Sequence, residues 1–144
     1  AVGVRGMKMR GEDTIVAVTL LEKDHLLTIS DVGFGKRTEF DEFMGHGRGT
    51  LGVRNMLLER DDNAVVIESR AVSAGDQIVV MTASGVVIRI RVGEIRIIGR
   101  GTRGVRIIRR DKGDRVVGVA LVPADEINGD VEPTVPPADE QENS

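Results

Sequence analysis

An eight-residue block that occurs twice is the feature that most constrains how this chain folds. Residues 47–54 read Gly-Arg-Gly-Thr-Leu-Gly-Val-Arg, and residues 99–106 repeat seven of these eight residues. The two copies are 52 residues apart, and a looser copy at residues 3–8 places Gly6 46 residues before Gly52. A period of this length is typical of solenoids, propellers and arrays, in which each unit packs against the next. We therefore expect structural units of about 50 residues.

The composition favours β-strands within these units. The chain has no Trp, no Tyr and only three Phe, so its core must consist of Val, Ile and Leu. β-Branched side chains are stiff at χ1 and pack well on a pleated surface, and the eighteen glycines allow tight turns. Residues 86–92 alternate apolar side chains with Val87, Arg89 and Arg91, which predicts a strand with two arginines on one face.

Short strands separated by hairpin turns are predicted throughout residues 1–123. A shift of 52 residues places Arg37 over Arg89, so the two units share one register. The expected strands are 14–20, 25–30, 34–40, 54–59, 64–68, 77–82, 86–92, 105–109 and 115–121. Four short antiparallel strands per unit are typical of propeller-like blades, so we expect an all-β, pinwheel-like fold of two to three blades. The chain begins within a repeat and without Met, and we expect it to be part of a longer chain.

The net charge of −3 hides two regions of opposite charge. Residues 124–144 contain seven of the 23 acidic residues and no Lys or Arg, which leaves residues 1–123 with 16 acidic and 20 basic residues. All four prolines lie at Pro123 or later. An acidic segment of this composition buries too little apolar surface to fold, so residues 124–144 are predicted to be a disordered tail. The tail either increases solubility or competes with a polyanion for the basic body.

The sequence offers little support for catalysis or metal binding. His25 and His46 are the only histidines and the chain has no cysteine, which excludes the common zinc ligand spacings. Residues 35–38 resemble the end of a phosphate-binding loop, but Arg37 stands where Ser or Thr must reach magnesium. No apolar run is long enough to span a bilayer. We expect a non-catalytic chain without its own cofactor, metal or membrane segment.

The repeated arginines and glycines are the candidate binding residues. Glycine allows positive φ, free N–H groups in such a turn bind anions, and arginine offers a fork that suits phosphate oxygens. Without an aromatic platform for stacking bases, duplex DNA is a better partner than a single strand. The alternative is a protein-interaction propeller, in which the glycines make turns between blades and the arginines pair with carboxylates. The candidate phosphate contacts are Lys36, Arg37, Arg48, Arg54, Arg89, Arg91, Arg100, Arg103 and Arg106, and the candidate turn glycines are Gly49, Gly52, Gly101 and Gly104.

Five motifs taken in order resemble the last blades of the C-terminal domain of the bacterial-type DNA gyrase A protein. The related C-terminal domain of topoisomerase IV shares this blade and is the second choice. The resemblance covers residues 1–123, and the acidic tail is similar to the end of the gyrase domain. The motifs are GFGKRT at 33–38, GRGTLGV at 47–53, DQIVVMT at 76–82, RIRVGEI at 89–95 and GRGTRGV at 99–105.

The resemblance implies a β-pinwheel that wraps duplex DNA on its basic perimeter, so that an ATP-driven holoenzyme can introduce negative supercoils. The family's wrapping heptapeptide, Gln-Arg-Arg-Gly-Gly-Lys-Gly, aligns with residues 46–52 and 98–104, which are degenerate copies. The family cleaves DNA with a tyrosine of the N-terminal region, and this chain has no Tyr. ATP and magnesium are thus expected elsewhere in a cytoplasmic A2B2 complex of the gyrase A and gyrase B proteins.

Overall fold

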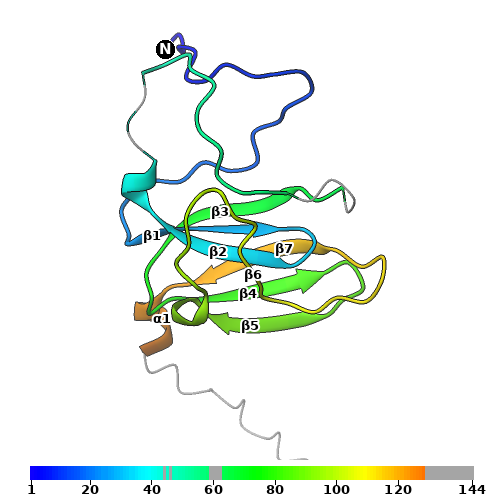
Figure 1. Ribbon diagram of the computed structural model, residues 1–144. Coiled ribbons are helices and arrows are strands. Elements are labelled where there is room, and N and C mark those ends of the chain that lie inside the picture. The colour runs from blue at the N-terminus through cyan, green and yellow to red at the C-terminus, as the bar shows by residue number, and fades with distance from the viewer. Residues whose placement is uncertain (44, 46, 59–62, 129–144) are drawn as a thin grey trace, which may run out of the picture.

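Two antiparallel sheets form the body of the protein. The computed structural model describes residues 1–43, 45, 47–58 and 63–128. In the first sheet the strand order is β3 (Val66–Val72), β1 (His25–Ser30), β2 (Phe34–Glu39) and β6 (Val105–Arg106). In the second sheet it is β5 (Val87–Arg91), β4 (Gln77–Thr82) and β7 (Val116–Val122). Figure 1 shows the sheets as two adjacent layers, with residues 1–23 and 47–58 largely to one side.

The two sheets are copies of one unit, which confirms the predicted repeat and the all-β fold. The hairpin β1–β2 is followed by a short 3₁₀ helix, η1 (Phe40–Glu42), and the hairpin β4–β5 is followed by η2 (Val92–Glu94), 52 residues later. β1 pairs with β3 and β4 pairs with β7, both antiparallel. The register shifts after Ile29 in one unit and after Met81 in the other, again 52 residues apart.

Most of the predicted strands are present, and the differences have a common cause. β1 and β4 coincide with the predicted ranges, β2 differs by one residue at one end, and β5 and β7 differ by one residue at each end. β3 begins two residues later and ends four later than predicted, whereas β6 is only two residues long. Residues 14–20 and 54–58 form no strand, and residue 59 of that second prediction lies outside the described residues. A strand requires a neighbouring strand, and residues 14–20 and 54–58 pair with no strand of the two sheets.

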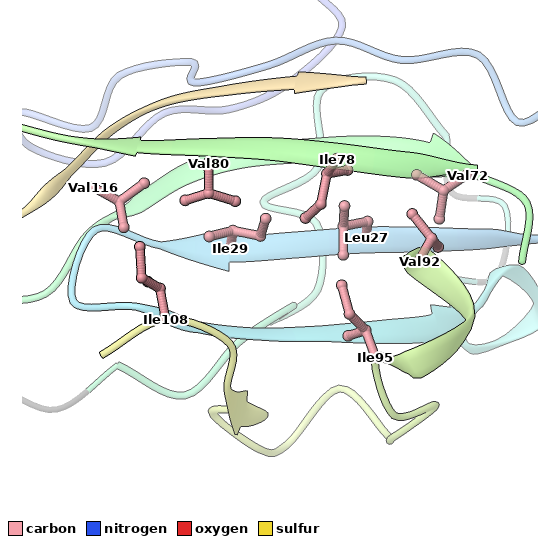
Figure 2. Packing of buried hydrophobic residues seen from close by; sticks show 9 residues of the cluster. All are labelled: Leu27, Ile29, Val72, Ile78, Val80, Val92, Ile95, Ile108 and Val116. Carbon is pink, nitrogen blue, oxygen red and sulfur yellow. The ribbon is translucent and has the colours of Figure 1, made fainter. Parts of the chain in front are cut away.

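The core lies between the sheets and joins the two units. Figure 2 shows Leu27 and Ile29 of β1 facing Ile78 and Val80 of β4. Complete burial of such a side chain contributes roughly 1.5–3 kcal/mol, so separating the sheets would cost the contributions of several residues. The two units therefore fold as one body. The full cluster comprises Leu27, Ile29, Val72, Ile78, Val80, Val92, Ile95, Ile108 and Val116.

The start of the predicted tail is ordered. The short helix α1 (Ala124–Asn128) follows β7 directly, so the prediction of disorder is wrong for these five residues. The Ala124 N–H donates to Asp76 Oδ1 at 3.0 Å, and the same buried carboxylate accepts from Lys23 Nζ and the Ser73 N–H, both at 2.9 Å. Burial raises the pKa of Asp76, but these hydrogen bonds outweigh it and hold the pKa below its ordinary value. Residues 129–144 of the predicted tail lie outside the described residues.

Candidate nucleic-acid interface

The second copy of the repeated block lies along β2, the edge of the first sheet. We call residues 95–109 the strap. The Arg37 N–H donates to the Arg96 carbonyl at 3.0 Å, and the Ile98 N–H donates back to the Arg37 carbonyl at 2.8 Å. Further along, β6 within the strap pairs antiparallel with β2, matching Phe34 with Arg106 (Figure 1). A segment of the second unit thus completes the sheet of the first, and it presents the strap's side chains on the surface.

Lys36 is buried beneath the strap, which corrects the expectation that it contacts phosphate from the surface. Its side chain has no exposed surface, and Nζ donates to the carbonyls of Gly99 at 2.7 Å and Arg100 at 3.0 Å. Burial lowers the pKa of Lys36, the nearby Glu42 carboxylate raises it, and the Arg100 guanidinium lowers it, with a net shift below the ordinary value. The ammonium group is used to hold the strap, and it is not available to a phosphate.

Arg37 is also buried, which corrects the same expectation for this residue. Its Nε donates to the Ile95 carbonyl at 2.7 Å and its Nη2 donates to the Gly93 carbonyl at 3.1 Å. The neighbouring Thr38 hydroxyl donates to the Ile98 carbonyl at 3.0 Å. Three consecutive β2 side chains, counting Lys36, therefore donate hydrogen bonds to backbone carbonyls of residues 93–100.

The repeat register contained a signal for the burial of Lys36. A shift of 52 residues matches Lys36 with Ile88, and Thr28 pairs with Lys36 as Val80 pairs with Ile88. The position therefore points toward the interior in both units. A basic residue at an interior position requires polar partners. The sequence does not reveal that the strap supplies them, because the strap residues lie about 60 positions away.

The turns of the two copies of the block contain the same hydrogen bond, but their backbone conformations differ. The Thr50 hydroxyl donates to the Gly47 carbonyl at 3.3 Å, and the Thr102 hydroxyl donates to the Gly99 carbonyl at 3.1 Å. Gly101 lies in this turn, but it lacks a positive φ, and a Cβ there would meet nothing within 4 Å. The turn is thus built mainly by the threonine and by other glycines of the block.

The last glycine of the block has a left-handed backbone in both copies. φ is +75° at Gly52 and +88° at Gly104, a region that other residues rarely adopt. A Cβ on Gly104 would lie 2.3 Å from the Gly35 carbonyl oxygen, whereas a Cβ on Gly52 would meet only Met7 Cε at 3.6 Å. Glycine at position 104 therefore allows the strap to pack closely against β2 and also allows the turn to form. Gly49 also has a positive φ, of +73°.

Arg100 makes contacts within the protein. Its N–H donates to Glu42 Oε2 at 2.9 Å, its Nη1 donates to the Arg54 carbonyl at 3.0 Å, and its Nε lies 4.0 Å from the same Glu42 carboxylate. The Leu57 N–H donates to the Thr102 carbonyl at 3.0 Å. The end of the first block thus lies beside the strap, and the half-buried Arg100 links the two.

Other arginines of the two blocks are exposed in this region. Arg103 and Arg106 are exposed on the strap, and their guanidinium carbons lie 4.4 Å and 4.9 Å from the centre of the Phe34 ring. Arg54 is exposed where the first block meets the strap. Two further exposed arginines of the strap, Arg96 and Arg109, escaped the sequence interpretation because they lie outside the repeated block. We call Arg54, Arg96, Arg103, Arg106 and Arg109 the strap arginines.

The remaining candidate arginines are exposed but are not part of this group. Arg89 and Arg91 lie on β5, the edge of the other sheet. The Arg89 guanidinium donates to Gln77, and Arg91, whose side chain is 76% exposed, forms an ion pair with Glu94 at 3.8 Å. Arg48 is exposed in the first block. The structure therefore divides the nine candidates into buried, internally bonded and exposed residues.

No group of three or more His, Cys, Asp or Glu side chains suited to a metal ion occurs within the described part of the chain. In the same residues, none of the helices has both the length and the apolar character required to cross a membrane.

Comparisons with known proteins agree with this architecture. A family model described as the DNA gyrase C-terminal domain, a β-propeller, matches residues 1–22, 24–67 and 76–123. The DNA gyrase A protein of Buchnera aphidicola is 39% identical over 129 residues, covering 89% of this chain and 15% of that protein. The gyrase A protein of Salmonella typhimurium is 37% identical over 123 residues, covering 85% and 14%. The chain thus spans about one seventh of the length of these relatives.

Solved structures show the same fold. The DNA gyrase A C-terminal domain matches with a TM-score of 0.75 and 28% identity, covering 83% of this chain and 41% of that structure. The C-terminal domain of DNA topoisomerase IV matches with a TM-score of 0.76 and 24% identity, covering 85% and 39%. The second likeness concerns the fold alone.

Proposed function

The chain belongs to the family of DNA gyrase C-terminal domains, and from this premise we propose that it binds duplex DNA along the strap arginines. The observation that carries the proposal is the position of these side chains. Four of them lie exposed on the strap, which is clamped to β2 by backbone pairing and by the buried Lys36 and Arg37, and Arg54 lies exposed beside the strap. Arginine forks on a rigid segment suit phosphate oxygens, and their alignment does not have to be formed during binding.

The proposed role is to bend DNA around the domain for the rest of the enzyme. Bending a short duplex by 40–90° costs on the order of 1–6 kcal/mol, which distributed phosphate contacts offset. The curved path would let a type II topoisomerase introduce negative supercoils with ATP. In this proposal the chain itself is non-catalytic and holds no cofactor. ATP, magnesium and DNA cleavage belong to the remainder of the gyrase A protein and to the gyrase B protein in an A2B2 complex in the cytoplasm.

A salt titration of DNA binding with two matched triple variants tests the proposal. Replacement of Arg54, Arg103 and Arg106 by Ala removes three charges from the strap region. Replacement of Arg48, Arg89 and Arg91 by Ala removes three charges from elsewhere. Each lost phosphate contact reduces the slope of log affinity against log salt by about one, so the first variant should show a slope shallower by about three. The second should retain most of the wild-type slope.

Equal losses in the two variants would mean that only net charge matters, and affinity independent of salt would contradict phosphate binding altogether. The competing function is a protein-interaction propeller, in which the basic residues make structural contacts. The internal hydrogen bonds of Lys36, Arg37 and Arg100 favour this alternative. That alternative predicts no affinity for duplex DNA in any variant. A topoisomerase IV-type domain is the alternative within the DNA-binding class.

A further inference from the structure

Phe34 is the aromatic side chain that two strap arginines share. Arg103 and Arg106 both approach its ring, at 4.4 Å and 4.9 Å from the centroid. We propose that Phe34, Arg103 and Arg106 form a phosphate-binding subsite, in which the ring orients two guanidinium groups toward phosphodiester oxygens of the DNA backbone. This inference rests on the proposed DNA-binding function and assigns a positioning role to a residue that contacts no phosphate itself.

The backbone around the subsite fixes where both arginines stand. Arg106 is the cross-strand partner of Phe34 in the β2–β6 pair, so its side chain starts directly beside the ring. Arg103 precedes Gly104, whose backbone lies so close to Gly35 that a Cβ would clash with the carbonyl oxygen at 2.3 Å. The two arginines therefore approach Phe34 from a segment that has little freedom to move away from β2.

The electrostatics of the subsite place two guanidinium groups at the Phe34 ring. The face of an aromatic ring attracts a cation, which explains why each arginine lies over Phe34. Arg106 has no carboxylate within ion-pair distance among residues 1–43, 45, 47–58 and 63–128. The arrangement thus holds positive charge at the surface and leaves Arg106 in particular available to a phosphate.

The two copies of the block differ at one position, which lies in this subsite. Arg103 corresponds to Leu51, whereas Arg106 corresponds to Arg54. Leu51 is 45% exposed and lies with Met7 and Lys8 around an open polar hollow. The first copy therefore offers one arginine where the second copy offers two beside a ring. We expect the strap to contribute more to DNA affinity than the first copy of the block does.

The test uses the full-length protein and a duplex DNA probe, with affinity measured over a range of salt concentrations. The swap variant, Arg103→Leu with Leu51→Arg, keeps the composition and net charge but moves one arginine away from Phe34. We expect it to bind more weakly, with a salt slope shallower by about one. Phe34→Leu keeps every charge and should weaken binding roughly two- to fivefold for each arginine that loses the ring. Phe34→Tyr keeps the ring face and should bind as the wild type does.

The outcomes separate this inference from the proposed function. If the wild type binds DNA with a salt dependence but the swap variant and Phe34→Leu bind equally well, the subsite is refuted and the proposed function stands. If Phe34→Leu and Phe34→Tyr weaken binding equally, the aromatic ring is not what positions the arginines, and the inference is likewise refuted. If the wild type does not bind DNA, both proposals are refuted. The swap changes only exposed positions, so it still tests the subsite if Phe34→Leu unfolds.

Discussion

Replacing Gly104 by Ala should detach the strap, and Gly52→Ala is the matched control. The two glycines occupy the same position in the repeated block, and both have a positive φ, of +88° and +75°. They differ in their surroundings. A Cβ on Gly104 would lie 2.3 Å from the oxygen and 2.7 Å from the carbon of the Gly35 carbonyl, whereas a Cβ on Gly52 would meet only the flexible end of Met7 at 3.6 Å.

The difference in unfolding free energy between the two variants measures the cost of losing the close contact between Gly104 and Gly35. A left-handed backbone costs an Ala about 1–2 kcal/mol, and the stiffer unfolded chain returns about 0.4–1 kcal/mol, so Gly52→Ala should destabilise by about 1 kcal/mol. Gly104→Ala must also move the strap, because the clash is with backbone that cannot rotate away. Losing two or three of the hydrogen bonds between the strap and β2, at about 0.5–1.5 kcal/mol each, adds about 3 kcal/mol.

Urea unfolding of both variants and the wild type provides the measurement. We expect the midpoint of Gly104→Ala to fall several times further than that of Gly52→Ala at a similar m-value. The DNA affinity of Gly104→Ala should fall as well, because Arg103 and Arg106 lose their fixed position. Equal destabilisation by the two substitutions would refute the reasoning, since it would mean that the strap does not require contact at this point.

Two further predictions concern buried and hydrogen-bonded charges. Lys36→Met should destabilise the protein by about 2–4 kcal/mol in urea unfolding, because two backbone carbonyls lose a charged donor. Arg48→Met, at an exposed position, should change stability by less than about 0.5 kcal/mol. Similarly small effects of the two substitutions would contradict a structural role for Lys36. Asp114 accepts hydrogen bonds from the hydroxyl and N–H of Ser84, at 2.6 Å and 3.0 Å, and hydrogen bonds from the Ser84 and Thr82 hydroxyls lead the causes that lower its pKa from 3.8 to about 2. Its contribution to stability is therefore complete above pH 3.8 and is lost as the pH falls toward 2, so the destabilisation caused by Asp114→Asn should shrink between pH 6 and pH 2; a constant difference across this range would contradict the assignment.

Local patterns account for the parts of the fold that the sequence predicts well. β1 and β4 coincide with the predicted ranges because short apolar runs and flanking turns define them without reference to a partner. Residues 14–20 have a strand-like composition but form no strand in this chain. Residues 124–128 have a tail-like composition but form α1, because Asp76 accepts the Ala124 N–H. In both cases the outcome depends on a partner that is distant in sequence.

The residues of the candidate site also include some that the sequence predicts and others that depend on distant partners. The repeated block correctly marked the segment that presents arginines at the surface, because repetition is visible in the residues themselves. It did not distinguish Arg103 and Arg106 from Lys36 and Arg37. All four are basic residues, and composition carries no information about which of them a segment some 60 residues away will cover.

The sequence by itself determined the repeated units, their 52-residue register and the all-β architecture, since periodicity and composition are read directly from the order of the residues. Only the tertiary structure decided what each basic side chain does. The strap of the second unit crosses onto β2 of the first, buries Lys36 and places Arg103 and Arg106 over Phe34. The sequence specifies which residues are charged, but the exposure of each charged side chain depends on packing between distant segments. Exposure distinguishes a basic residue that stabilises the fold from one that can bind DNA.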